Sequence, residues 1–145
     1  MQTRLDDAAL DMRRKRRRAM VTRVLDAADH LPAEERQLLV AIYGRGMAVS
    51  EVAVMLGAPE RRLRRRVRAL VRRVCDPNFD AAVRLSPELP RQFRQVARLK
   101  AIEGLPMRLI AQRLGVSYHT VRKHYDAFRA LIEAAGSRPS PGSTA

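Results

Sequence analysis

The chain has 145 residues, room for one ordinary domain or two very small ones, and 46% of them are apolar or aromatic, which excludes disorder throughout. Lysine and arginine outnumber aspartate and glutamate by 29 to 15, a net charge of +14, so a polyanion is the expected partner. The single cysteine, Cys75, excludes an intrachain disulfide, and no apolar run approaches the roughly 18 residues of a membrane span, so we expect a cytoplasmic protein without membrane contact.

Residues 1–30 are predicted to form a basic N-terminal helix. Its apolar residues lie loosely on one side, with acids in the first turns and the cluster RRKRRR in the middle. Such a cluster either follows a DNA backbone or enters the minor groove, and a merely solvated face is the alternative. The apolar positions are Leu5, Met12, Met20, Val24 and Ala28, and the expected phosphate contacts are Arg13, Arg14, Arg16 and Arg17.

An internal repeat follows this helix. The segment LPAEERQLLVAIYGRGMAVSEVAVMLGAPERRLRRRVRALVRRV from Leu31 aligns without a gap with LPRQFRQVARLKAIEGLPMRLIAQRLGVSYHTVRKHYDAFRALI from Leu89, at an offset of 58 with ten of 44 positions identical. The apolar pattern repeats as well, at the spacing i, i+4, i+7 and i+11 that marks one face of a helix. The corresponding residues are Leu63, Val67, Leu70 and Val74 in the first repeat and Val121, Tyr125, Phe128 and Ile132 in the second.

The first repeat, residues 31–76, is predicted as helix, short turn, helix, tight turn, helix. Gly44 or Gly46 can take the positive φ that ends the first helix, because glycine has no Cβ to clash there. Ser50 is expected to cap the short second helix and Gly57 to end it.

The second repeat, residues 89–135, has the same predicted order. Gly104 and Gly115 end its first two helices, and Ser117 is expected to cap the long third one. Residues 77–88 between the repeats are rich in turn formers and are predicted to be a linker. Residues 136–145, rich in Gly, Ser and Pro, are expected to be a disordered tail.

The repeats resemble known DNA-binding domains. The stretch from LPAEER through YGRG to EVAVMLG resembles region four of bacterial sigma factors, and LGVSYHTVRKH resembles the recognition segment of LuxR-type regulators as well. Both families share a four-helix form of the helix-turn-helix, whose second helix enters the DNA major groove. The resemblance implies an all-α fold, with two tandem helix-turn-helix units preceded by the N-terminal basic helix. A complete sigma factor is not expected, because no segment corresponds to its large promoter-melting domain.

In the second repeat, the predicted base-reading residues stand opposite the apolar stripe at the start of the last helix. Arg122 is the best candidate for a bidentate contact with guanine, and Lys123 can reach guanine or phosphate. Tyr118 either contacts the backbone or is partly buried, and Ser117 can cap the helix and meet a phosphate. The base-reading set is Tyr118, His119, Thr120, Arg122 and Lys123.

In the first repeat, Pro59 and Glu60 stand where Ser117 and Tyr118 stand in the second. The arginines that follow are too dense for a mixed donor and acceptor code, and they favour phosphate contact over base reading. These expected phosphate contacts are Arg61, Arg62, Arg64, Arg65 and Arg68.

The sequence therefore predicts a bacterial or phage transcription regulator that binds double-stranded DNA in the nucleoid, with no enzymatic activity, no cofactor and no metal site. An architectural protein that coats or bridges DNA is one alternative, and a region-four mimic that binds RNA polymerase or a sigma factor is another. Helix-turn-helix proteins often form homodimers, but a tandem repeat can supply internal pseudo-symmetry to a monomer.

Overall fold

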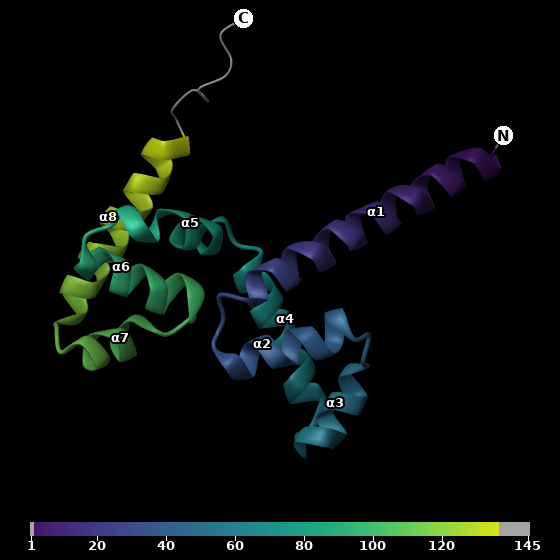
Figure 1. Cartoon of the computed structure of the whole chain (residues 1–145), viewed down its shortest axis with the longest axis horizontal. Helices are drawn as coiled ribbons and strands as arrows, with labels where there is room; N and C mark the ends of the chain where they lie inside the picture. The colour runs from purple at the N-terminus through teal and green to yellow at the C-terminus, as the bar shows by residue number, and fades with distance from the viewer. Residues whose placement is uncertain (1, 137–145) are drawn as a thin grey trace, which may run out of the picture. The chain divides into compact units, whose positions relative to one another are not determined.

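The computed structural model describes residues 2–136, and these residues form eight α-helices and no strand (Figure 1). The predicted all-α fold is confirmed. The chain divides into two compact units, Met1–Cys75 and Asp76–Ala145. The expected disordered tail lies outside the described residues, apart from Gly136.

The first unit is built from four helices. Glycines in the left-handed region follow two of them, Gly46 with a φ of 71° and Gly57 with a φ of 62°. The helices are α1 (Gln2–Ala28), α2 (Ala33–Leu39) with its π-helical extension Val40–Gly44, α3 (Val49–Leu56) and α4 (Glu60–Val74).

The apolar stripe of α4 forms the centre of the first core. Leu63, Val67, Leu70 and Val74 are 2–5% exposed, and α4 packs against α1, α2 and α3. Burying each side chain contributes about 1.5–3 kcal/mol, so this one face accounts for much of the stability of the unit.

The predicted apolar residues of helix α1 differ in burial along the length of the helix. Val24 and Ala28 are fully buried in the first unit, whereas Leu5 is 74% and Met12 52% exposed. At about 100° per residue the five residues fall within about 160° around the helix, loosely on one side, and the difference in burial lies along the length of the helix. The end of α1 is therefore part of the first core, and the described residues 3–20 are exposed.

The second unit repeats the first at the predicted offset. Helices α2, α3 and α4 begin at residues 33, 49 and 60, and their counterparts begin 58 residues later. Gly104 and Gly115 have φ values of 71° and 68°, as their partners do. The elements are α5 (Pro77–Leu85) with a short 3-10 turn Ser86–Glu88, α6 (Arg91–Ala97) with its π-helical extension Arg98–Ile102, α7 (Met107–Leu114) and α8 (Tyr118–Gly136).

The linker prediction for residues 77–88 is wrong. Asp76 caps helix α5 by accepting a hydrogen bond of 2.7 Å from the backbone N–H of Asn78, and Pro77 occupies the first helical position. Phe79, Ala81 and Ala82 are 1–2% exposed. Helix α5 therefore supplies core residues to the second unit, in the place that the end of α1 takes in the first.

The prediction that Ser50 caps α3 is also wrong. The helix begins one residue earlier, at Val49, and its N-cap is Ala48, which has no side-chain hydrogen-bond acceptor. Pro106 occupies the corresponding position in the second unit, where α7 begins at Met107.

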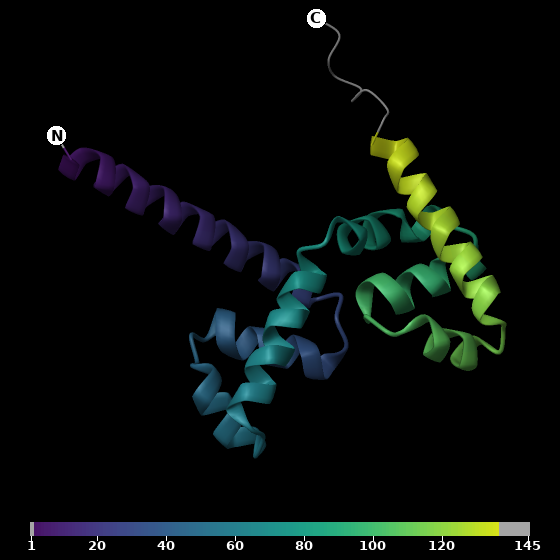
Figure 2. The same ribbon diagram turned by 180° about the vertical axis from the view of Figure 1, so that it is seen from behind.

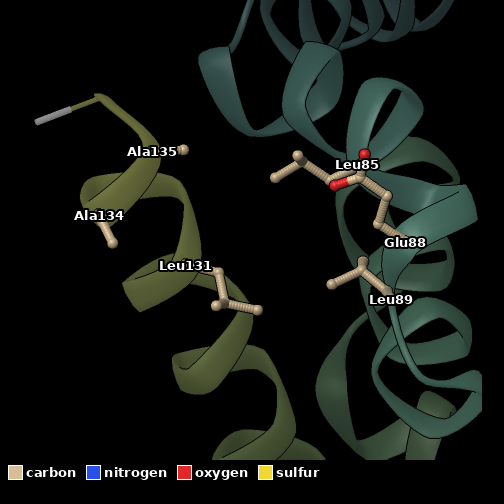
Figure 3. A pocket seen from close by; sticks show the side chains of 6 residues that line it. All are labelled: Leu85, Glu88, Leu89, Leu131, Ala134 and Ala135. Atoms are coloured by element: carbon tan, nitrogen blue, oxygen red, sulfur yellow. The ribbon is translucent and has the colours of Figure 1, made fainter. Parts of the chain in front are cut away.

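An apolar pocket of about 230 Å³ lies in the second unit beside the last turns of α8. Figure 3 shows Leu131, Ala134 and Ala135 of α8 on one side and Leu85, Glu88 and Leu89 on the other. Glu88 is the one charged side chain in this lining, so the surface suits apolar contact.

Candidate nucleic-acid interface

Helix α8 separates an apolar inner face from a polar outer face. Val121 and Phe128 are fully buried against α6 and α7, and Tyr125 is 9% exposed beside Phe128, with ring centroids 5.9 Å apart. Burial raises the pKa of the Tyr125 hydroxyl above its ordinary value of 10.0, and the charge of Asp76 adds to this, whereas Arg129 acts in the opposite sense. The inner face therefore fixes the rotation of the helix.

The outer face at the start of α8 carries most of the predicted base-reading residues. Tyr118 is 47% exposed, and His119, Arg122 and Lys123 are exposed as well. The first one and a half turns or so of the helix therefore offer two cations, an imidazole and a phenol to solvent. This mixture of donors and acceptors is what recognition of base edges requires.

Ser117 caps α8, as predicted. Its Oγ accepts a hydrogen bond of 3.1 Å from the backbone N–H of Thr120, and it lies 2.9 Å from the Thr120 Oγ1. Thr120 is half-buried, and its hydroxyl takes part in the cap. Of the predicted base-reading set, Thr120 is the residue whose hydrogen-bonding groups are already engaged.

His124 lies on the side of α8 that faces α6. Its ring meets the Phe93 ring edge-on, with centroids 4.9 Å apart and an interplanar angle of 67°. This edge-on contact between two rings indicates that His124 packs the helix against α6.

Helix α4 carries its predicted phosphate contacts on its exposed surface. Arg61, Arg62, Arg65 and Arg68 make no ion pair with another described residue. Arg64 is paired with Glu60 one turn earlier, at 2.5 Å, and both side chains are about half exposed. Cations at i, i+3 and i+4 repel one another, so an anion bound along this face would stabilise the helix.

Two other arginines of α4 form ion pairs with glutamates of α2. Arg73 donates to Glu35 at 2.5 Å, in a pair whose side chains are only 21% and 18% exposed, and Arg66 donates to Glu34 at 3.1 Å. Both glutamates stand in the first turn of α2, where negative charge is favourable. The arginines of α4 are thus divided between an outer face and a contact with α2. Sequence reasoning missed these pairs, although the acidic pair after Leu31 and Pro32 was a visible signal.

Helix α1 presents its basic cluster to solvent. Arg13, Arg14, Arg16 and Arg17 are all exposed. A shallow hollow on one side of the helix is lined by Arg14, Arg17, Arg18, Val21 and Thr22. Phosphates would reach these arginines without any rearrangement of the unit.

An apolar groove of about 210 Å³ on α2 and α3 was not predicted from the sequence. Arg45 and Arg66 are among its polar lining, and Met55 and Leu56 are 73% and 59% exposed. The neighbouring Val54 is 83% exposed. The apolar lining consists of Leu38, Ala41, Met47, Val52, Met55 and Leu56.

The described residues hold no group of three His, Cys, Asp or Glu side chains that could bind a metal ion. Within the same residues, no helix has the length and apolarity needed to cross a membrane.

The sequence model of the sigma-70 region 4 family matches residues 27–74, which cover the end of α1 and all of α2, α3 and α4. This segment is a sigma-factor region-four-like helix-turn-helix domain, and that family is a DNA-binding one. No curated protein and no solved structure matched the chain.

Proposed function

We propose that this protein binds double-stranded DNA through both helix-turn-helix units and acts as a transcription regulator of a bacterium or phage. The observation that carries the proposal is the exposed arginine face of α4, in the segment that matches a DNA-binding family. In this proposal the protein acts in the cytoplasm on the nucleoid, without catalysis.

The two units have different tasks in this proposal. The second unit reads bases with the residues from Tyr118 to Lys123, because its outer face combines several kinds of donor. The first unit, including α1, holds phosphates, because the exposed face of α4 and the basic cluster of α1 are dense in arginine. Arg108 and Arg113 on α7 are exposed too, where the first helix of the motif crosses the DNA backbone.

The test compares Arg122→Ala with Arg65→Ala on a duplex selected from a random pool and on a scrambled duplex. Arg122→Ala should cost about 1–3 kcal/mol on the selected duplex and relax the preference at one base pair. Arg65→Ala should weaken binding to both duplexes alike and reduce the salt slope by about 1. For the wild type we expect a slope near −7, from about eight neutralised phosphates.

Arg84→Ala is the matched control. Arg84 is an exposed arginine on α5 that is paired with Asp80 and is not among the residues proposed to contact DNA, so its loss should leave both affinities unchanged. Equal losses on both duplexes for Arg122→Ala and Arg65→Ala would contradict the division of tasks. Equal wild-type affinity for the two duplexes would favour an architectural protein instead.

RNA polymerase or a sigma factor is a second candidate partner, and the apolar groove on α2 and α3 favours it. Exposed Met55 and Leu56 beside Val52 offer a surface for an apolar side chain of another protein. Met55→Asp should abolish retention of polymerase in the presence of nuclease and high salt. Retention that is unchanged in this variant would exclude the groove as the contact.

A further inference from the structure

Most of α1 is a helix without a partner in its own unit. Its last turns pack on the first core, but residues 3–20 are exposed throughout, and Figures 1 and 2 both show this part extending beyond α2, α3 and α4. At 1.5 Å per residue these 18 positions span about 27 Å. A helix of this length in water gains little from propensity alone, so a packing partner would stabilise it.

The exposed part has an apolar stripe of its own. Ala9, Met12 and Ala19 follow Leu5 by four, seven and fourteen residues, the spacing of one helix face that pairs with another. Leu5 and Met12 are 74% and 52% exposed. Arg16 also falls in the stripe, where its aliphatic stem can lie along apolar surface while the guanidinium reaches water.

The charges of α1 are separated along its length. Asp6, Asp7 and Asp11 occupy the first half, and residues 13–18 are six consecutive cations. Two parallel copies would place Asp6 beside Asp6 and Arg13 beside Arg13, whereas two antiparallel copies centred near Ala9 place Asp6 of each beside Arg13 of the other. Asp6 and Arg13 directly follow Leu5 and Met12, so both stand on the same side of the stripe.

We propose that α1 pairs with α1 of a second copy of this chain, in antiparallel orientation and centred near Ala9. Leu5, Ala9 and Met12 form the contact, and Asp6 of each copy faces Arg13 of the other. The two-fold axis makes this interface self-complementary, so each contact occurs twice. Alanine at the centre allows the two backbones to approach closely.

The pairing goes beyond the proposed function and does not rest on it. Arg14, Arg17 and Arg18 line the hollow with Val21, away from the stripe, and they remain exposed when the stripe is covered. A paired α1 therefore keeps cations free for phosphate. The dimer itself is expected without any nucleic acid present.

The test is charge reversal in the full chain, followed by sedimentation velocity in the absence of DNA. Asp6→Arg or Arg13→Asp alone should weaken self-association by about tenfold or more, because each places two pairs of like charges together. An equimolar mixture of the two variants should dimerise again, since both cross-pairs then join opposite charges. Circular dichroism of each variant checks that α1 stays helical.

The matched controls lie one residue further along. Asp7→Arg and Arg14→Asp make the same charge changes at the same spacing, but on a side of the helix that the proposed contact does not use. They should leave self-association unchanged. A monomeric wild type, equal effects of the control variants, or a mixture that stays monomeric would each overturn the pairing.

Discussion

Two roles are assigned to Ser117, the cap at the start of α8 and a contact with phosphate, and two substitutions test these roles separately. In Ser117→Ala the backbone N–H of Thr120 loses the 3.1 Å hydrogen bond to the Ser117 Oγ. Because Ser117 is exposed, water replaces part of that bond, and we expect a loss of about 1 kcal/mol in the free energy of unfolding. For a unit of this size, that loss corresponds to a fall of about 5 °C in the thermal midpoint, measured by calorimetry of the full chain.

Ser117→Asp is the informative partner of that variant. Aspartate caps a helix as well as serine does, so the thermal midpoint should remain near that of the wild type. Its negative charge would stand beside a bound phosphate, and we expect duplex affinity to fall by roughly five- to tenfold. An unchanged midpoint for Ser117→Ala would refute the cap as a source of stability, and unchanged affinity for Ser117→Asp would refute the phosphate contact.

Two further predictions concern stability. Gly57→Ala should lower the free energy of unfolding by about 1 kcal/mol, because the φ of 62° is strained for a residue with a Cβ, although no atom lies within 4 Å of the added carbon. Gly44→Ala is the control, because its added Cβ meets only ordinary contacts at 3.5 Å. It should cause no loss in the same urea titration. The raised pKa of Tyr125 means that the unfolded chain loses its phenolic proton first, so this residue leaves stability unchanged below pH 10 and lowers it as the pH rises further. Urea titrations at several pH values should show that part of the alkaline loss disappears in Tyr125→Phe, and an identical pH dependence in both proteins would contradict the assignment.

The repeat carried most of the fold prediction. Periodicity placed Leu63, Val67 and Leu70 in the core, and the turn glycines at Gly57 and Gly115 adopt the positive φ that their positions required. These predictions succeeded because the underlying constraints are local. An apolar spacing and a left-handed residue can both be recognised without knowledge of the partner segments.

The wrong predictions, the linker at residues 77–88 and the cap at Ser50, concern residue types that occur in more than one kind of local structure. Asp76 and Pro77 are common in turns, but they also begin helices, and only the burial of Phe79 decides between the two. The hydroxyl of Ser50 suits a cap, but Pro106 at the position of Ala48 in the other repeat indicates that the helix starts earlier.

The candidate site was harder to predict than the fold. The exposure of Arg61 and Arg65 follows from the stripe of α4, but the roles of Arg66 and Arg73 depend on Glu34 and Glu35, more than 30 residues away. Long-range ion pairs leave no periodic signal. The exposure of Met55 and Leu56 could not be predicted either, because an apolar residue in a short helix is usually assigned to the core.

The constant offset of 58 between the two units means that they are equivalent parts with different outer surfaces. Residues 61–65 of α4 and residues 119–123 of α8 occupy the same register over equivalent core positions. Outer side chains can therefore be transplanted from one helix to the other without altering the packing beneath them. A chain of this kind could acquire a second reading surface by duplication followed by exchange of a few exposed residues, with its interior left intact.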